Sequence, residues 1–280
     1  MAYKEGQPQA VLREAYEPPA YLLDHTDLTF ELAEGVTEVT AALALRRAPG
    51  QEAVPLVLQG QALELLGLAL DGVPLSGNEY RIEGDTLVVP AMPEQGTLTI
   101  KTRIFPEKNT ALEGLYRSGG MYCTQCEAEG FRRITYSLDR PDVLSRYRTT
   151  IRGDGATLPI MLSNGNEVSR QMLADGRQEV VWEDPFPKPS YLFALVAGDL
   201  QWIEDRFLTA SGRDVTLRIY TEPHNITQVD YAMDALKRSM RWDEETYGRE
   251  YDLDIFMIVA VDDFNMGAME NKGLNIFNTS

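Results

Sequence analysis

Glu270, a carboxylate near the end of the sequence, is the clearest candidate for a functional side chain. It lies between two glycines, Gly267 and Gly273, in a loop that follows a seven-residue apolar run at 255–261. Glycine lets a backbone turn sharply or approach another group closely. A carboxylate in such a loop suits a small cation, such as the free ammonium group of a peptide N-terminus. Glycine-flanked acidic loops are also common as solvent-exposed turns without a function. Composition alone therefore leaves open whether Glu270 binds a cation or is simply solvated.

Two cysteines, Cys123 and Cys126, form the second pattern that could do chemistry. A C-x-x-C pair occurs in thioredoxin-like redox sites, but the strand and following helix of such a site are not evident here. The pair also forms half of a structural zinc site, but tetrahedral zinc needs four protein ligands. The two histidines of the chain, His25 and His224, are far apart in sequence. We therefore expect no metal site in this chain.

The elements that must position these residues are mainly β strands. Short apolar runs recur along the first 199 residues, separated by Gly and Pro turns, a rhythm typical of a sandwich-like or saddle-shaped β domain. Asp71-Gly72 marks one tight hairpin. We expect this N-terminal β domain to cover residues 1–199, with its boundary at Gly198-Asp199. The expected strands lie at 28–32, 39–45, 63–70, 80–82, 86–89, 97–100, 146–151, 159–162, 179–182 and 191–196.

A second segment, 200–280, combines strands with one long helix. We expect the helix over 225–248, because Thr227 followed by Asp230 matches a capping box and Gly248 suits the residue after a helix end. Its apolar stripe indicates core packing rather than a binding surface, and consists of Ala232, Met233, Leu236, Met240 and Tyr247. The expected strands of this segment lie at 215–220, at 255–261, where the unbroken apolar run indicates burial on both faces, and at 274–278.

The string G-A-M-E-N after an apolar strand resembles the exopeptidase motif of the aminopeptidase N family, the gluzincin zinc aminopeptidases. Three further blocks look like the bacterial alanyl aminopeptidase branch of this family, in the expected order. They are N-T-A-L-E-G-L-Y at 109–116 followed by C-T-Q-C-E-A-E-G-F at 123–131, D-R-P-D-V-L at 139–144, and D-P-F-P-K-P-S-Y-L-F-A-L-V-A-G-D at 184–199. The blocks cover most of the chain from about residue 109 onward, and the first hundred residues carry weaker resemblance.

The resemblance implies a fold, an activity and a set of binding residues. The fold would be an N-terminal β domain followed by the β-rich opening part of a thermolysin-like catalytic domain. The activity would be zinc-assisted removal of single N-terminal residues from peptides. Glu270 and Glu127 would hold the α-ammonium of the substrate, with Gln125 at their side, while Gly267 and Ala268 would offer backbone groups. The implied substrate-binding set is Gln125, Glu127, Met266, Gly267, Ala268, Met269, Glu270 and Asn271.

Complete members of this family continue into a helix with the motif H-E-x-x-H, whose two histidines bind zinc from one face. The 280 residues contain no such motif. We therefore expect an N-terminal fragment that ends before the zinc motif, with zinc in the complete enzyme and no metal ligand or catalytic residue in this chain. Such a chain would be inactive alone. Its expected partners are peptide or amino-acid N-termini and the remainder of the catalytic domain.

Two alternatives stay open. The chain could be a stand-alone, non-catalytic module that binds amines or peptide N-termini through Glu127 and Glu270. It could also be a relative with other chemistry, such as the leukotriene-epoxide hydrolases. Those carry Gly-Gly-Met-Glu-Asn, so Ala268 argues against that branch.

Charge and hydropathy exclude several other classes of protein. The net charge is −17, from 26 basic and 43 acidic residues, and no polybasic run exists, so we expect no binding to nucleic acid or anionic membranes. The N-terminus has no apolar core of signal-peptide length. No apolar run reaches the roughly eighteen residues of a membrane span. With only two cysteines and no disulfide framework, we expect a cytoplasmic protein.

Overall fold

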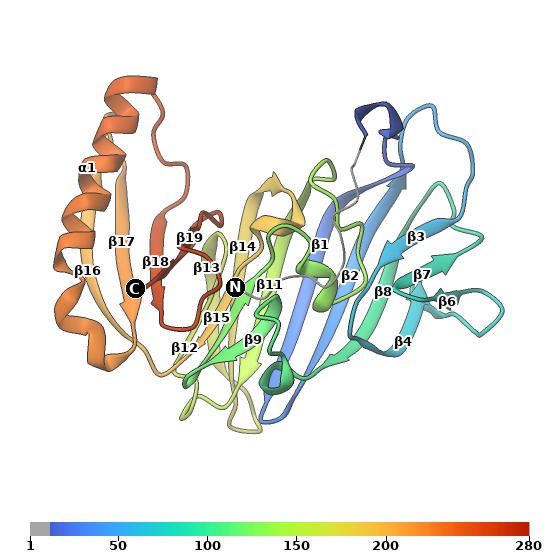
Figure 1. Cartoon of the computed structure of the whole chain (residues 1–280), viewed down its shortest axis with the longest axis horizontal. Coiled ribbons are helices and arrows are strands. Elements are labelled where there is room, and N and C mark those ends of the chain that lie inside the picture. The colour runs from blue at the N-terminus through green and yellow to red at the C-terminus, as the bar shows by residue number, and fades with distance from the viewer. Residues whose placement is uncertain (1–11, 280) are drawn as a thin grey trace.

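The structure is a computed structural model that describes residues 12–279. These residues form four β sheets and one α-helix, arranged as an elongated body with the helix at one end (Figure 1). The expected mainly-β class is confirmed. Residues 1–11 of the expected first domain, and Ser280 of the second segment, lie outside the described part. No helix of this described part is long and apolar enough to cross a membrane.

Eight strands form the largest sheet, in the order β13-β14-β11-β1-β2-β8-β4-β5. At its centre the long strands β1 and β2 pair as a hairpin in which alternate side chains are buried. Asp71 and Gly72 have φ values of 49° and 80°, as a type I′ turn requires, so the expected hairpin is confirmed. The bounds are β1 (Tyr21–Ala33), β2 (Val36–Arg47), β4 (Glu64–Leu70), β5 (Val73–Pro74), β8 (Gln95–Ile104), β11 (Ser145–Gly153), β13 (Asn166–Met172) and β14 (Gln178–Lys188).

Two smaller sheets share one buried apolar core with the large sheet. Phe193 lies inside this core, with its ring centroid 5.3 Å from Phe131, 5.9 Å from Phe30 and 6.0 Å from Tyr147. Such clustered aromatic rings bury much apolar area in favourable orientations. The three-stranded sheet consists of β3 (Leu56–Gln59), β7 (Thr86–Val89) and β6 (Arg81–Glu83), and the four-stranded sheet of β12 (Ile160–Ser163), β15 (Leu195–Gly198), β10 (Met121–Gln125) and β9 (Gly114–Ser118).

The expected strand at 191–196 is wrong at its start. A 3-10 turn, η4 (Ser190–Leu192), precedes β15. The Asn164 side chain explains the difference, because its Nδ2 donates to the Leu192 carbonyl (2.9 Å) and its Oδ1 accepts from the Ala194 N–H (2.8 Å). These backbone groups therefore bond to a side chain instead of a strand. The other 3-10 turns are η1 (Arg13–Ala15), η2 (Pro106–Lys108), η3 (Phe131–Arg133) and η5 (Pro223–Gln228).

The fourth sheet uses strands from residue 201 onward, in the order β16-β17-β18-β20-β19. Its three inner strands are parallel to one another, and the two edge strands run antiparallel to their neighbours. The bounds are β16 (Gln201–Leu208), β17 (Asp214–Thr221), β18 (Ile255–Val261), β19 (Ala268–Met269) and β20 (Leu274–Asn278). The expected strands at 215–220 and 274–278 are thus present.

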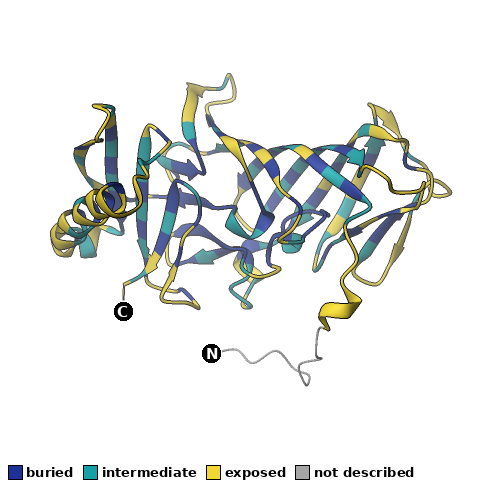
Figure 2. Cartoon of the chain, turned by 90° about the horizontal axis from the view of Figure 1, so that it is seen from above, coloured by how far each residue is buried: buried dark blue, intermediate teal, exposed yellow. Residues whose placement is uncertain are grey.

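The two faces of β18 are buried to different extents. Met257, Val259 and Val261 are fully buried in the core that the other sheets share. Phe256 and Ile258, on the other face, are only half-buried. The expected burial on both faces is therefore only partly right, because α1 (Asp230–Tyr247) contacts β16 and β17 and lies at the outer end of the molecule (Figure 2).

The helix α1 begins later than expected. Residues from Pro223 to Gln228 form the 3-10 turn η5, and the N-cap is Val229, which makes no side-chain capping bond. The expected capping box of Thr227 and Asp230 is therefore wrong. Of the expected stripe, the side chains of Met233, Leu236 and Met240 are buried under the helix, Ala232 is half-buried, and Tyr247 is 64% exposed, so its assignment to the core is wrong.

Gly248 ends α1 as expected, in the left-handed conformation with φ 62° and its N–H donating to the Glu244 carbonyl. A Cβ added at this position would meet nothing within 4 Å. We predict that Gly248→Ala lowers the free energy of unfolding by about 1–2 kcal/mol through backbone strain alone. Urea unfolding checks this, with Gly77→Ala as the control, since Gly77 has equally open surroundings and no positive φ. Equal effects of the two substitutions would contradict the prediction.

Candidate functional site

The G-A-M-E-N residues form a loop that leaves β18 and returns as β20. Within it, Ala268 and Met269 make the short edge strand β19, paired with β20. The Asn278 N–H donates to the Gly267 carbonyl (2.9 Å), and the Leu274 N–H donates to the Asn271 carbonyl (3.1 Å). The loop is therefore held on one side by β20, while the other side of β19 has no strand partner among residues 12–279.

The loop meets the block around Gln125, although 141 residues separate the two in sequence. Gln125 ends β10 and is 1% exposed. Its Nε2 lies 2.7 Å from the Met266 sulfur, and its Oε1 accepts from the Glu127 N–H at 3.3 Å. One buried amide thus connects the segment that carries Glu127 with the loop that carries Glu270.

Other contacts fix the same junction. The Tyr116 hydroxyl donates to the Asp263 carbonyl at 3.0 Å. Ser118 Oγ lies 3.2 Å from Asp263 Oδ2 and accepts from the Asp263 N–H at 3.1 Å. Asn265 Nδ2 donates to the Leu112 carbonyl at 3.0 Å. The start of the loop is therefore held by residues near β9 and β10, in the four-stranded sheet.

The expected site residues fall into three groups by exposure. Gln125, Met269 and Asn271 are buried, at 1%, 0% and 1% exposure, and Met269 belongs to the apolar core. Glu127 is half-buried, and the remaining loop residues are exposed: Met266, Gly267, Ala268 and Glu270. The carboxylates of Glu127 and Glu270 make no hydrogen bond or ion pair to any side chain in the described range, so no protein cation neutralises them.

The C-x-x-C pair has no features of a reactive site. Cys123 and Cys126 are both fully buried and free. Burial raises the pKa of the Cys123 thiol to about 12 and that of Cys126 well above its ordinary value. Because the thiolate is the nucleophile and the metal ligand, these side chains serve as packing in β10 and the turn after it.

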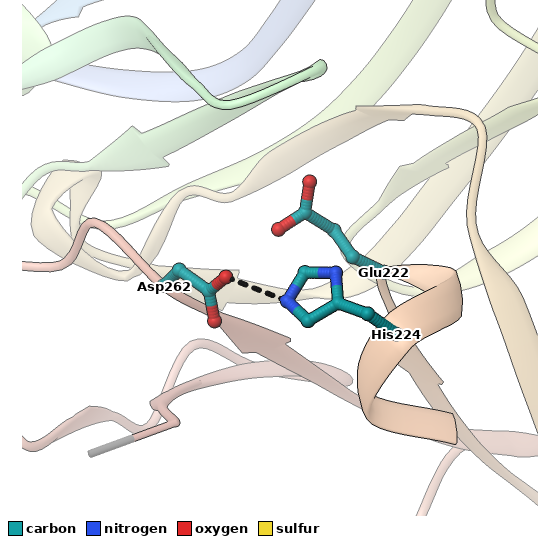
Figure 3. A group of neighbouring side chains, drawn as sticks. All are labelled: Glu222, His224 and Asp262. Atoms are coloured by element: carbon teal, nitrogen blue, oxygen red, sulfur yellow. Dashed lines mark hydrogen bonds and ion pairs between the residues drawn. The ribbon is translucent and has the colours of Figure 1, made fainter. Parts of the chain in front are cut away.

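Sequence reasoning missed one constellation of polar side chains. Glu222 and Asp262 approach His224 at one end of the five-stranded sheet (Figure 3). The sequence does place both carboxylates at strand ends, since Glu222 directly follows β17 and Asp262 directly follows β18. Only the parallel pairing of these two strands shows that their ends meet.

Comparison with known proteins places the chain in a family. Residues 24–192 match the Peptidase M1 N-terminal domain, and residues 231–280 match the Peptidase family M1 domain. The chain belongs to the peptidase M1 family. It is 55% identical to aminopeptidase N of Caulobacter vibrioides and 53% identical to aminopeptidase N of Escherichia coli, each over 273 residues. Both alignments cover 98% of this chain and 31% of the relative, so the chain spans about a third of these relatives' length.

The fold is shared with a solved aminopeptidase structure. The structure of Legionella pneumophila aminopeptidase A in complex with aspartic acid superimposes with a TM-score of 0.89 at 37% identity, covering 95% of this chain and 32% of that chain. The expected architecture, an N-terminal β domain followed by the opening part of the catalytic domain, is thereby confirmed.

Proposed function

We propose that this chain supplies the α-amino recognition part of an M1 aminopeptidase that removes single N-terminal residues from peptides. The Gln125–Met266 contact carries the proposal, because it joins the segments of Glu127 and Glu270. Both carboxylates are free of protein partners within residues 12–279. The similar Legionella enzyme was solved with aspartic acid, a ligand with a free amino group, which supports amino-acid or peptide binding here.

The chemistry of the site fits a peptide N-terminus. A charge-assisted hydrogen bond to an ammonium group contributes about 1.5–3 kcal/mol, or roughly ten- to a hundredfold in affinity. The edge of β19 that is unpaired within residues 12–279 offers backbone N–H and carbonyl groups to an extended peptide, as in strand addition to a sheet edge. A site that requires a free amine at a fixed position limits cleavage to the first peptide bond.

The two-histidine zinc site implied by the family does not fit the residues present. The 280 residues contain no H-E-x-x-H, and His25 lies on β1 whereas His224 lies in η5. We therefore propose that this chain is inactive alone and that zinc belongs to the complete enzyme.

We also propose the domain boundary at Gly198-Asp199, since three sheets use strands up to β15 and the fourth uses strands from β16 onward.

We predict that Glu270→Gln weakens binding of alanine amide by roughly ten- to a hundredfold, because the neutral amide loses the charge-assisted contact. Isothermal titration calorimetry measures this. Glu245→Gln is the matched control, because it changes the net charge by the same amount at an exposed glutamate on α1. N-acetylated alanine amide, which lacks the ammonium group, should not bind. Equal affinities of wild type and Glu270→Gln, or equal binding of the acetylated ligand, would contradict the proposed site.

The proposed inactivity has its own measurement. The chain should not release chromophore from an aminoacyl chromogenic substrate with added zinc. Turnover that a chelator abolishes would contradict the proposed inactivity but not the proposed amine site. The two parts of the proposal can therefore fail separately.

A further inference from the structure

Three side chains that the proposed amine site does not use converge at one end of the five-stranded sheet (Figure 3). Glu222 follows β17, Asp262 follows β18, and His224 lies at the start of η5. One ligand atom of each residue lies within 4.8 Å of the other two. Because β17 and β18 are parallel, their carboxyl ends share one edge of the sheet, the edge at which open parallel sheets commonly bind ligands.

We propose that Glu222, His224 and Asp262 bind one divalent transition-metal ion of the Zn²⁺ class. One imidazole nitrogen and two carboxylate oxygens form a mixed set that suits such an ion better than Ca²⁺ or Mg²⁺, which prefer oxygen ligands alone. The site stands on its own residues and does not depend on the proposed amine binding.

The orientation of Asp262 is fixed by its neighbours. Its Oδ1 accepts from Thr279 Oγ1 at 2.6 Å and from Asn225 Nδ2 at 3.2 Å. Its Oδ2 is left facing His224 Nε2 at 3.0 Å. Outer partners that hold a carboxylate in this way are typical of metal ligands, because they orient the binding oxygen before the ion arrives.

His224 Nε2 faces two groups with opposite requirements. The donor Asn225 Nδ2 lies 3.1 Å away, and the acceptor Asp262 Oδ2 lies 3.0 Å away. A neutral Nε2 that accepts from Asn225 presents its lone pair near a carboxylate, and a protonated Nε2 meets a second donor. A metal ion bound to both Nε2 and Oδ2 removes the conflict, since Asn225 keeps Asp262 Oδ1 as its acceptor.

Glu222 reaches the cluster because Gly119 leaves space for it. A Cβ at Gly119 would lie 2.9 Å from Glu222 Oε1. Within the described residues, His224 is the only basic side chain paired with Glu222 or Asp262. Two carboxylates therefore share at most one positive charge, and a divalent ion would balance the excess negative charge.

The spacing allows one ion. Zinc binds nitrogen and oxygen ligands tetrahedrally at roughly 2.0–2.2 Å, so two of its ligand atoms lie about 3.4 Å apart. The side chains of His224 and Asp262 are 60% and 40% exposed, which leaves them room for the rotations that bring the three ligand atoms from within 4.8 Å of one another to this separation. Their exposure also leaves the outward coordination positions open to water.

Calorimetric titration of the metal-free chain with Zn²⁺ tests the proposal. We expect one ion per chain, not displaced by excess Ca²⁺ or Mg²⁺. Outer partners of metal ligands alone contribute about 10–100-fold in affinity, so His224→Gln, Asp262→Asn and Glu222→Gln should each lose at least tenfold. The matched control is His25→Gln, which removes the only other histidine, itself 3.2 Å from Asp27, and should bind as the wild type does.

Urea unfolding of the metal-free variants separates ligand loss from misfolding. We expect all of them to unfold at concentrations near that of the wild type, since the substituted side chains are exposed or half-buried. Absence of Zn²⁺ binding by the wild type, equal affinity of His224→Gln and wild type, loss of binding in His25→Gln, or displacement by Ca²⁺ would each overturn the proposal. None of these results bears on the binding of alanine amide.

Discussion

Lys188→Met is expected to lower the free energy of unfolding by about 3–5 kcal/mol, the usual effect of removing one partner of a buried ion pair. Lys188 is 3% exposed, and its Nζ lies 3.1 Å from Asp184 Oδ2 and 3.8 Å from the centre of the Tyr147 ring. Asp184 is fully buried. Without the lysine, its carboxylate would stay in the interior with no cation among residues 12–279, where it accepts only the Phe186 N–H.

The double variant Asp184→Asn, Lys188→Met is the control. It removes both charges and leaves a side-chain oxygen to accept from Phe186, so it should recover most of the lost stability. Urea unfolding followed by tryptophan fluorescence measures all three proteins. A single variant as stable as the wild type, or a double variant as unstable as the single one, would show that the pair does not act through charge burial.

The same lysine gives the stability a defined pH dependence. Burial lowers the pKa of Lys188 from 10.5 to about 8. Between these values the unfolded chain binds the proton and the folded chain does not, so unfolding takes up a proton and stability rises with pH. The wild type should therefore gain stability relative to Lys188→Met from about pH 8 toward 10.5. A stability difference that stays constant over this window would contradict the lowered pKa.

Gly165→Ala is expected to have an effect of similar size. Gly165 joins β12 to β13 with φ 90°, and a Cβ there would lie 2.1 Å from the Glu183 carbonyl oxygen and 2.6 Å from the Asp184 nitrogen. Both are backbone atoms of β14 that cannot rotate away. Strain at positive φ costs about 1–3 kcal/mol and overpacking about 1–3 kcal/mol more, so the free energy of unfolding should fall by about 2–6 kcal/mol.

Gly176→Ala separates the two contributions. Gly176 has a similar φ of 85°, but a Cβ there would meet nothing within 4 Å. This variant should lose only the strain part, about 1–3 kcal/mol, in the same urea measurement. If the two alanine variants were equally stable, the close approach of β14 to Gly165 would have no energetic consequence.

Local sequence rules predicted much of the fold because the patterns and the contacts lie in the same segment. The alternating runs became strands, and Asp71-Gly72 and Gly248 took the positive φ values that their turns require. The failures occurred where distant residues decide the backbone. Asn164 binds the groups that would have extended β15 toward Ser190, and η5 occupies the residues that resembled the first turn of the helix.

The candidate site shows the same limit. Resemblance supplied Glu127 and Glu270, but no local pattern predicts that Gln125 contacts Met266, because this depends on how two sheets pack. The polar cluster around His224 was missed for a related reason. Its carboxylates come from the ends of two strands that pair only in the folded sheet.

The contact between the β12–β13 connection and the five-stranded sheet has a consequence for the evolution of the protein. Asn164 Nδ2 donates to the Lys272 carbonyl at 2.8 Å, and Asn166 exchanges two hydrogen bonds of 3.0 Å with Asp254. The proposed site therefore draws its parts from two domains whose mutual fit sets their spacing. These contacts form a seam between the two domains, and substitutions on either side of it should change the affinity of the proposed amine site without touching its ligand. The two domains should consequently evolve together. A chimera that takes one domain from a relative should keep amine binding only when the seam residues of the other domain are exchanged as well.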